Sequence, residues 1–233
     1  LGFNTYLEKY PDYNDQLFPT LIRCEKTHAW GYLSTPSGRL MTIATDSPVA
    51  SYTLDYQSGA HRIYSASLDV LQSGKLPERH PQGLDKLAPG EEKTWNIYLK
   101  PVTTLNAIED VKEVIAKNTD LPMFDADRYT LAQGEQSQIT ILSKSAIKDN
   151  KLTIEDPEGN ISKLDIEKES DGNYKAVFEA ADKLEGVYKI TAENAEGYIA
   201  EMNLSIRKDW SWYIKKAREA AVEAPQKGTS HGE

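Results

Sequence analysis

The residues best suited to hold a charged ligand lie together at Glu78-Arg79-His80, in a segment flanked by prolines. An arginine in such a loop could hold the carboxylate of a uronic acid through paired N–H donors. The same three residues could also form an ion pair that packs the loop against a sheet, and this structural interpretation is favoured because surface ion pairs are common. Arg79 and His80 are therefore candidates for sugar binding, without a predicted catalytic role.

Aromatic side chains are the second group that could bind a sugar, because their faces stack on the apolar faces of pyranose rings. The candidates are Trp30 and Tyr32, with Tyr52 and Tyr98 as further exposed aromatics. Aromatic residues at strand spacing are more often part of a core, since each buries a large area. Both interpretations remain open at this stage.

Catalytic and metal-binding patterns do not emerge from the remaining residues. The four histidines have none of the spacings that hold zinc. Asp-rich turns such as Asp125-Ala126-Asp127 lack the full calcium loop with its distal Glu. No G-x-S-x-G, no Gly-rich phosphate loop and no local pair of carboxylates suited to glycoside hydrolysis is present. We therefore predict no catalytic residue, no metal ligand and no cofactor.

Cys24 is the single cysteine, so the chain forms no internal disulfide. It lies in the strand-like run Leu21-Ile22-Arg23-Cys24-Glu25, where a free cysteine usually behaves as a small core residue. An unsupported thiol is seldom a nucleophile. The sequence favours a structural Cys24.

An amphipathic helix is predicted near the end of the chain, within residues 209–233. Apolar residues at three- and four-residue spacing form one face, and charged residues form the other. The apolar face includes Trp210 and Tyr213, with Trp212 beside them. Such a face must be buried against the chain's own β domains or against a further domain. We expect Trp210, Trp212 and Tyr213 to dock a further domain.

Composition and charge exclude some partners. The chain has 233 residues and a formal net charge of −9. Phosphate-rich partners need a basic patch, so neither nucleic acid nor an anionic membrane surface is expected as a partner. No apolar run approaches the roughly 20 residues that a membrane helix needs, so we expect no membrane insertion.

Two β-rich modules account for most of the length, in a mainly β fold. Residues 1–102 contain six strand-length runs rich in β-branched and aromatic residues, separated by turn signals. These runs are 21–25, 29–34, 39–44, 50–56, 62–71 and 93–100, with a loop over 73–86. Residues 103–124 are predicted to be a helical connector, since apolar residues there recur at helical spacing and a capping box precedes them.

Residues 125–208 are predicted to form an immunoglobulin-like sandwich of seven strands. Its strand runs are 128–131, 138–143, 151–154, 161–167, 174–179, 186–193 and 198–206. Tyr188 lies two residues before the position of the second cysteine in antibody domains, which is the spacing of a tyrosine corner. Ile190 occupies the cysteine position, so apolar packing replaces the inter-sheet disulfide.

A family resemblance rests on residues 30–33, 35–39, 48–56, 76–81 and 87–95, on the second module and on the Trp-rich helix. Together they resemble the accessory β domains of carbohydrate-active enzymes from gut Bacteroidetes, of the unsaturated-uronyl-hydrolase-like or polysaccharide-lyase-like kind. The resemblance implies a supersandwich-like module, here only partial, and an immunoglobulin-like module that precede an (α/α)₆ catalytic barrel. It also implies that the catalytic carboxylates lie in the barrel.

The leading hypothesis is a non-catalytic segment that positions a C-terminal helical catalytic domain of the same parent protein, in the periplasm or outside the cell, with polysaccharide as a possible ligand. A free-standing glycan-binding or surface-adhesion protein is the alternative. A third hypothesis, that the chain itself acts on sugars, requires two carboxylates that converge in a cleft.

Overall fold

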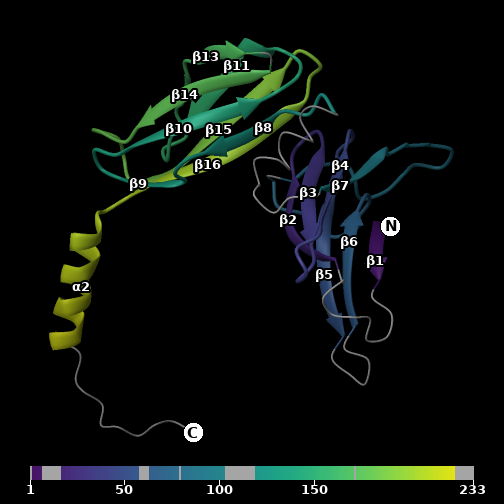
Figure 1. Ribbon diagram of the computed structural model, residues 1–233, viewed down its shortest axis with the longest axis horizontal. Coiled ribbons are helices and arrows are strands. Elements are labelled where there is room, and N and C mark those ends of the chain that lie inside the picture. Colours follow the sequence, from purple (N-terminus) through teal and green to yellow (C-terminus); the bar gives the residue numbers. More distant parts are fainter. Residues whose placement is uncertain are drawn as a thin grey trace, which may run out of the picture.

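The computed structural model describes residues 2–6, 17–57, 63–78, 80–102, 119–170 and 172–223. Two β modules and one helix make up this part of the chain (Figure 1). The mainly β fold class predicted from the sequence is confirmed, since almost all regular structure consists of strands in antiparallel sheets.

The first module consists of two sheets. A four-stranded sheet has the order β2-β3-β4-β7, and a three-stranded sheet has the order β1-β6-β5. The strands are β1 (Gly2–Tyr6), β2 (Phe18–Cys24), β3 (Ala29–Ser34), β4 (Leu40–Thr45), β5 (Ser51–Gln57), β6 (Ile63–Asp69) and β7 (Ile97–Val102). Residues 73–78 and 80–86 carry neither strand nor helix, in agreement with the predicted loop.

Both faces of the β2-β3-β4-β7 sheet are covered at β3 and β4, and the alternation of side chains in β3 shows how. Ala29 and Leu33 face the first module's own core, which they share with Ile43 and Leu68. Trp30, between them in sequence, points to the opposite face and joins a separate cluster that includes residues of the second module. A strand with side chains of period two therefore serves two cores at once.

Gly31 allows β2 and β3 to approach closely. A Cβ at this position would lie 2.2 Å from the backbone oxygen of Leu21 and 2.9 Å from the Cα of Ile22. The register of the pair also shifts between Pro19 and Leu21. This close approach of the two backbones explains why the position carries no side chain.

The second module is a two-sheet sandwich. One sheet has the order β13-β14-β10-β8, and the other has the order β12-β11-β15-β16-β9. The pairs are antiparallel except that β9 runs parallel to β16. The strands are β8 (Met123–Ala126), β9 (Thr130–Ala132), β10 (Gln136–Leu142), β11 (Ile147–Glu155), β12 (Ile161–Lys163), β13 (Glu167–Ser170), β14 (Asn173–Glu179), β15 (Gly186–Asn194) and β16 (Ile199–Arg207).

Two details of the second module differ from the seven strands predicted. The run 161–167 is not one strand. β12 ends at Lys163, and β13 begins at Glu167 in the opposite sheet, with the buried Leu164 between them. A short strand, β8, begins at Met123, inside the range predicted to be a connector. Most of that predicted helix, residues 103–118, lies outside the described residues.

Tyr188 forms the predicted corner bond. Its side chain is buried, and its hydroxyl donates to the backbone oxygen of Leu184 at 2.9 Å. Its ring packs against Phe178 of β14 at a centroid distance of 5.2 Å, and Ile190 is fully buried in the same core. The hydroxyl bond satisfies the polar end of a ring that is otherwise in an apolar environment.

Candidate functional site

The C-terminal helix α2 (Trp210–Glu223) follows β16 after two residues. Asp209 is its N-cap, because Oδ1 of Asp209 accepts a hydrogen bond from the amide of Trp212 at 3.0 Å. Lys208 forms an ion pair with Glu185, the residue before β15, and so holds the strand end where the helix departs. Only two residues therefore join the paired end of β16 to the first residue of α2.

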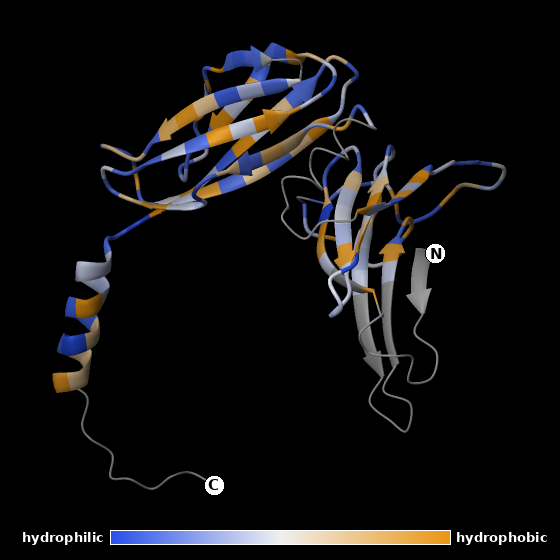
Figure 2. Ribbon diagram, viewed as in Figure 1, coloured by the Kyte–Doolittle hydropathy of each residue, from blue (hydrophilic) through white to orange (hydrophobic). Residues whose placement is uncertain are grey.

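The aromatic face of α2 is exposed. We use the name helix face for Trp210, Trp212, Tyr213 and Ile214, whose exposed fractions are 68%, 40%, 41% and 58%. No residue of α2 is buried. Figure 1 shows the helix standing away from both β modules, and Figure 2 shows apolar and polar residues distributed around it.

The rings of the helix face are arranged against one another. Tyr213 contacts Trp212 edge to face, with centroids 5.0 Å apart, and Trp210 at 6.0 Å. The Arg207 guanidinium lies 4.7 Å from the centre of the Trp210 ring. Trp, Tyr and Arg are the residues that most often dominate binding at protein interfaces. The three predicted docking residues are thus all exposed, and Tyr213 contacts both tryptophans.

A second surface, which we call the module contact, joins the two β modules. Its apolar part contains Trp30, Leu40 and Ala44 of the first module with Leu121 and Met123 of the second. All five side chains are buried. Asn194, also buried, donates to the backbone oxygen of Asp120 at 2.6 Å and so ties the chain entering β8 to the β15–β16 turn.

The polar part of the module contact pairs the end of β2 with the beginning of β16. Glu25 Oε2 accepts a hydrogen bond from the amide of Glu201 at 3.1 Å, and the Arg23 guanidinium donates to the carbonyl of Glu201. Arg23 Nε also lies 3.1 Å from Glu25 Oε1. Side chains of the first module therefore satisfy backbone groups on the edge of a strand in the second.

Glu25 and His28 are the titratable groups buried in this contact. Burial raises the pKa of the Glu25 carboxyl, and the nearby Arg23 charge opposes this rise. Burial also lowers the pKa of His28 to about 3, so its imidazole is neutral near pH 7. His28 packs edge to face on Tyr198 at a centroid distance of 6.0 Å. These groups face a closed interface and have no access to a substrate.

The described members of the predicted sugar-binding set do not form an exposed aromatic surface. Trp30 is only 3% exposed and belongs to the module contact, so its ring is not available for stacking on a sugar and the core interpretation replaces the expectation. Tyr32 is half-buried against the same cluster. His80 is half-buried, with Nδ1 3.1 Å from the backbone oxygen of Ala50. Arg79 lies outside the described residues.

Cys24 has the structural role predicted for it. It packs against the core of the first module. Burial, followed by the charges of Glu25 and Asp69, raises the pKa of its thiol to about 12. A thiol that stays protonated is a poor nucleophile.

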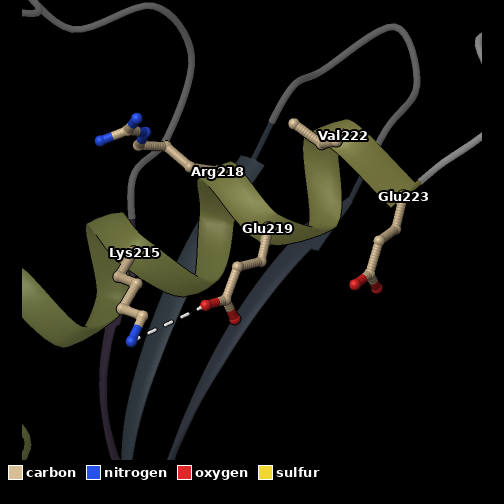
Figure 3. A pocket seen from close by; sticks show the side chains of 5 residues that line it. All are labelled: Lys215, Arg218, Glu219, Val222 and Glu223. Atoms are coloured by element: carbon tan, nitrogen blue, oxygen red, sulfur yellow. Dashed lines mark ion pairs between the residues drawn. The ribbon is translucent and has the colours of Figure 1, made fainter.

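The hollow beside the last turns of α2 is lined by Lys215, Arg218, Glu219, Val222 and Glu223, all from one helix (Figure 3). Lys215 and Glu219 approach each other at 4.0 Å, whereas the side chains of Arg218 and Glu223 point apart. Among the residues described, no group of three His, Cys, Asp or Glu side chains is placed to hold a metal ion. No described helix is both long and apolar enough to cross a membrane.

The sequence interpretation missed the module contact. Glu25, Thr27 and His28 follow a strand in the sequence and resemble ordinary turn residues. Nothing in their spacing indicates that they meet Ile199 and Glu201. The one available signal was that strands β3 and β4 are apolar on both faces, with burial patterns that scarcely alternate. Such a pattern indicates a sheet covered on both sides.

Comparisons with known proteins place the fold. No protein-family model matches the chain, and no curated protein matches it. Among solved structures, a polysaccharide lyase is similar with a TM-score of 0.62 and 12% sequence identity, over 93% of this chain and 31% of that chain. This chain therefore spans about a third of the length of that structure.

Two other solved structures are less similar to this chain. The filamin domain of Lin-41 has a TM-score of 0.30 at 11% identity, over 38% of this chain and 93% of that chain. A glycan-binding protein of the Bacteroides ovatus mixed-linkage glucan locus has a TM-score of 0.26 at 14% identity, over 86% of this chain and 45% of that chain. At such identities the likeness concerns the fold alone: the chain has the β-module architecture found in part of a polysaccharide lyase.

Proposed function

We propose that this chain is an accessory segment of a polysaccharide-degrading protein, in which two β modules carry and position a helical catalytic domain of the same parent chain. The observation that carries the proposal is the helix face. Three aromatic rings and Ile214 are exposed on a helix that packs on neither β module. Exposed apolar groups of this kind mark sites of protein contact.

The β modules suit this role because they provide a fixed base for the helix. β16 contacts the first module through Ile199 and Glu201, and its other end leads into α2 after two residues. One strand thus links the module contact to the helix face. A domain docked on α2 would have a defined position relative to both modules.

The remaining parts of the proposal concern the modules and their location. The strand order and the Tyr188–Leu184 bond support an immunoglobulin-like module over 125–208, after a first module over 1–102. Similarity of fold to part of a polysaccharide lyase supports a role in carbohydrate degradation. Such substrates lie outside the cytoplasm, so we place the protein in the periplasm or outside the cell.

Truncation after Lys208 tests whether α2 serves a further domain. If it does, the free energy of unfolding of the β modules will be nearly unchanged when the helix is removed. If α2 instead packs on the β core in solution, the loss will be several kcal/mol, as for a few buried aromatic residues. A Lys216→Ala variant on the polar side of α2 is a control for effects of local sequence on helix formation.

The parent gene provides the second test. A reading frame that continues after Glu233 into several hundred residues of paired amphipathic helices would support the proposal. A stop codon directly after Glu233 would contradict it, and the chain would then be examined as a free-standing glycan-binding or adhesion protein.

A further inference from the structure

A cluster of polar side chains lies at the end of the four-stranded sheet, where β4 ends and β7 begins. Thr45 pairs with Ile97 in the antiparallel register, so Asp46 and Asn96 leave the sheet side by side. Tyr98 follows Asn96 two positions along β7 and shares its face. Two strands far apart in the sequence, labelled β4 and β7 in Figure 1, thus pair so that a carboxylate, an amide and a phenol come to one place.

These three side chains are bound to one another. Asp46 Oδ2 accepts hydrogen bonds from Asn96 Nδ2 at 2.9 Å and from the hydroxyl of Tyr98 at 2.8 Å. The backbone amides of Asn96 and Asp46 also bond to this carboxylate. Asp46 Oδ1 receives a long contact from the Ser47 hydroxyl at 3.4 Å.

The Tyr98 ring is both exposed and held in place. Its exposed fraction is 44%, and β7 is the outermost strand of its sheet. Because its hydroxyl is tied to Asp46, the ring loses little additional freedom when a ligand stacks on it. Preorganisation of this kind improves affinity by reducing the entropy lost on binding.

We propose that Asp46, Asn96 and Tyr98 form a binding site for a neutral saccharide, with the Tyr98 ring under the apolar face of a pyranose and the Asp46 and Asn96 side chains bonded to its hydroxyls. This inference extends the proposed function and rests on its carbohydrate context. An aromatic platform beside a carboxylate and an amide matches the two surfaces of a sugar, one apolar and one lined with hydroxyls.

The charge of the site selects the class of saccharide. Burial tends to raise the pKa of Asp46, but the bonds from Asn96 and Tyr98 hold it below its usual value, so the group is a carboxylate near pH 7. The carboxylate of a uronic acid would meet the Asp46 charge directly. A chain of neutral sugars avoids this repulsion.

Affinity electrophoresis through gels that contain soluble polysaccharides tests the site. The neutral probes are a mixed-linkage β-glucan, a xylan and a galactomannan, and the acidic probe is polygalacturonate. We expect at least one neutral gel to retard the protein, and Tyr98→Ala to weaken that binding by about tenfold or more, on the scale of a lost stacking contact with its hydroxyl bond. Tyr98→Phe keeps the ring and should weaken binding less.

Tyr52→Ala is the matched control, because Tyr52 is 45% exposed but lies on the other sheet of the same module. It should leave retardation unchanged. The proposal is overturned if no neutral polysaccharide retards the protein, if Tyr98→Ala binds as the native chain does, or if Tyr98 supports binding to polygalacturonate instead. None of these outcomes bears on the truncation after Lys208, so the two proposals fail separately.

Discussion

Thr27 and Ile199, 172 positions apart, meet through a reciprocal hydrogen bond: the amide of Ile199 donates to Thr27 Oγ1 at 2.8 Å, and the hydroxyl donates back to the carbonyl of Ile199 at 3.3 Å. The Thr27 side chain thus satisfies the backbone amide and carbonyl of Ile199, as a neighbouring strand would. Glu25 and Arg23 do the same for Glu201, two residues further along. Because β9 pairs only with residues 205–207, this part of β16 would otherwise be an open edge.

Removing the Thr27 hydroxyl should therefore leave the backbone of Ile199 without its partner at a contact that excludes much of the water. We expect Thr27→Ala to lower the free energy of unfolding by about 1–2 kcal/mol. Urea denaturation, followed by tryptophan fluorescence, measures the change. Thr27→Ser retains the hydroxyl and should recover most of the loss. An equal loss in both variants would show that the methyl group, and not the hydrogen bond, stabilises the contact.

Arg23 and Glu25 should be strongly coupled, because Glu25 is buried and Arg23 is its paired cation. Arg23→Met leaves a buried carboxylate without its partner, and we expect a loss of about 3 kcal/mol at pH 7. Adding Glu25→Gln should recover part of this loss, since a neutral amide costs less to bury. A double-mutant cycle gives the coupling energy directly. Additive losses would mean that the two side chains act independently.

The hydroxyl of Tyr188 offers a cleaner test within the second module. Tyr188→Phe keeps the ring against Phe178 but leaves the carbonyl of Leu184 without its donor. We expect a loss of about 1 kcal/mol, the scale of one hydrogen bond in a partly buried position. Tyr174→Phe is the comparison: it removes the acceptor of the buried Ile147 amide at 3.3 Å and should cost at least as much, because that amide has less access to water. The reverse order would contradict this account of the corner.

Local pattern predicted the strands well wherever one face of a strand is buried within its own module. Residues 29–34 were predicted as a strand and form β3 with the same bounds, and the tyrosine spacing correctly indicated the bond from Tyr188. The run 161–167 was misjudged because its apolar residues, Ile161, Leu164 and Ile166, recur through the whole run while the chain changes sheets between β12 and β13. Periodicity does not reveal which sheet a strand joins.

The placement of the candidate residues depended on contacts distant in sequence. Trp30 has the type and spacing of an exposed sugar platform, yet the second module covers it. The meeting of Asp46 with Tyr98 depends on the β4–β7 register across the predicted loop. By contrast, helix α2 itself was predictable, because its apolar residues recur at three- and four-residue spacing, whereas its exposure depends on what lies beside it.

His28 should make stability depend on pH. Burial lowers the pKa of His28 from 6.5 to about 3. Between these pH values the imidazole is protonated in the unfolded chain and neutral in the native state. Stability from this residue is complete above pH 6.5 and is lost as the pH falls, by up to about 1.4 kcal/mol per pH unit. Glu25, whose pKa burial raises, acts in the opposite direction, so the effect is isolated by comparing the native chain with His28→Gln. The free energy of unfolding is measured by urea denaturation at roughly pH 7, 6, 5 and 4.5. It should fall more steeply with decreasing pH in the native chain than in the variant. Parallel curves would mean that His28 takes up a proton in the folded state, and that the module contact admits a charge.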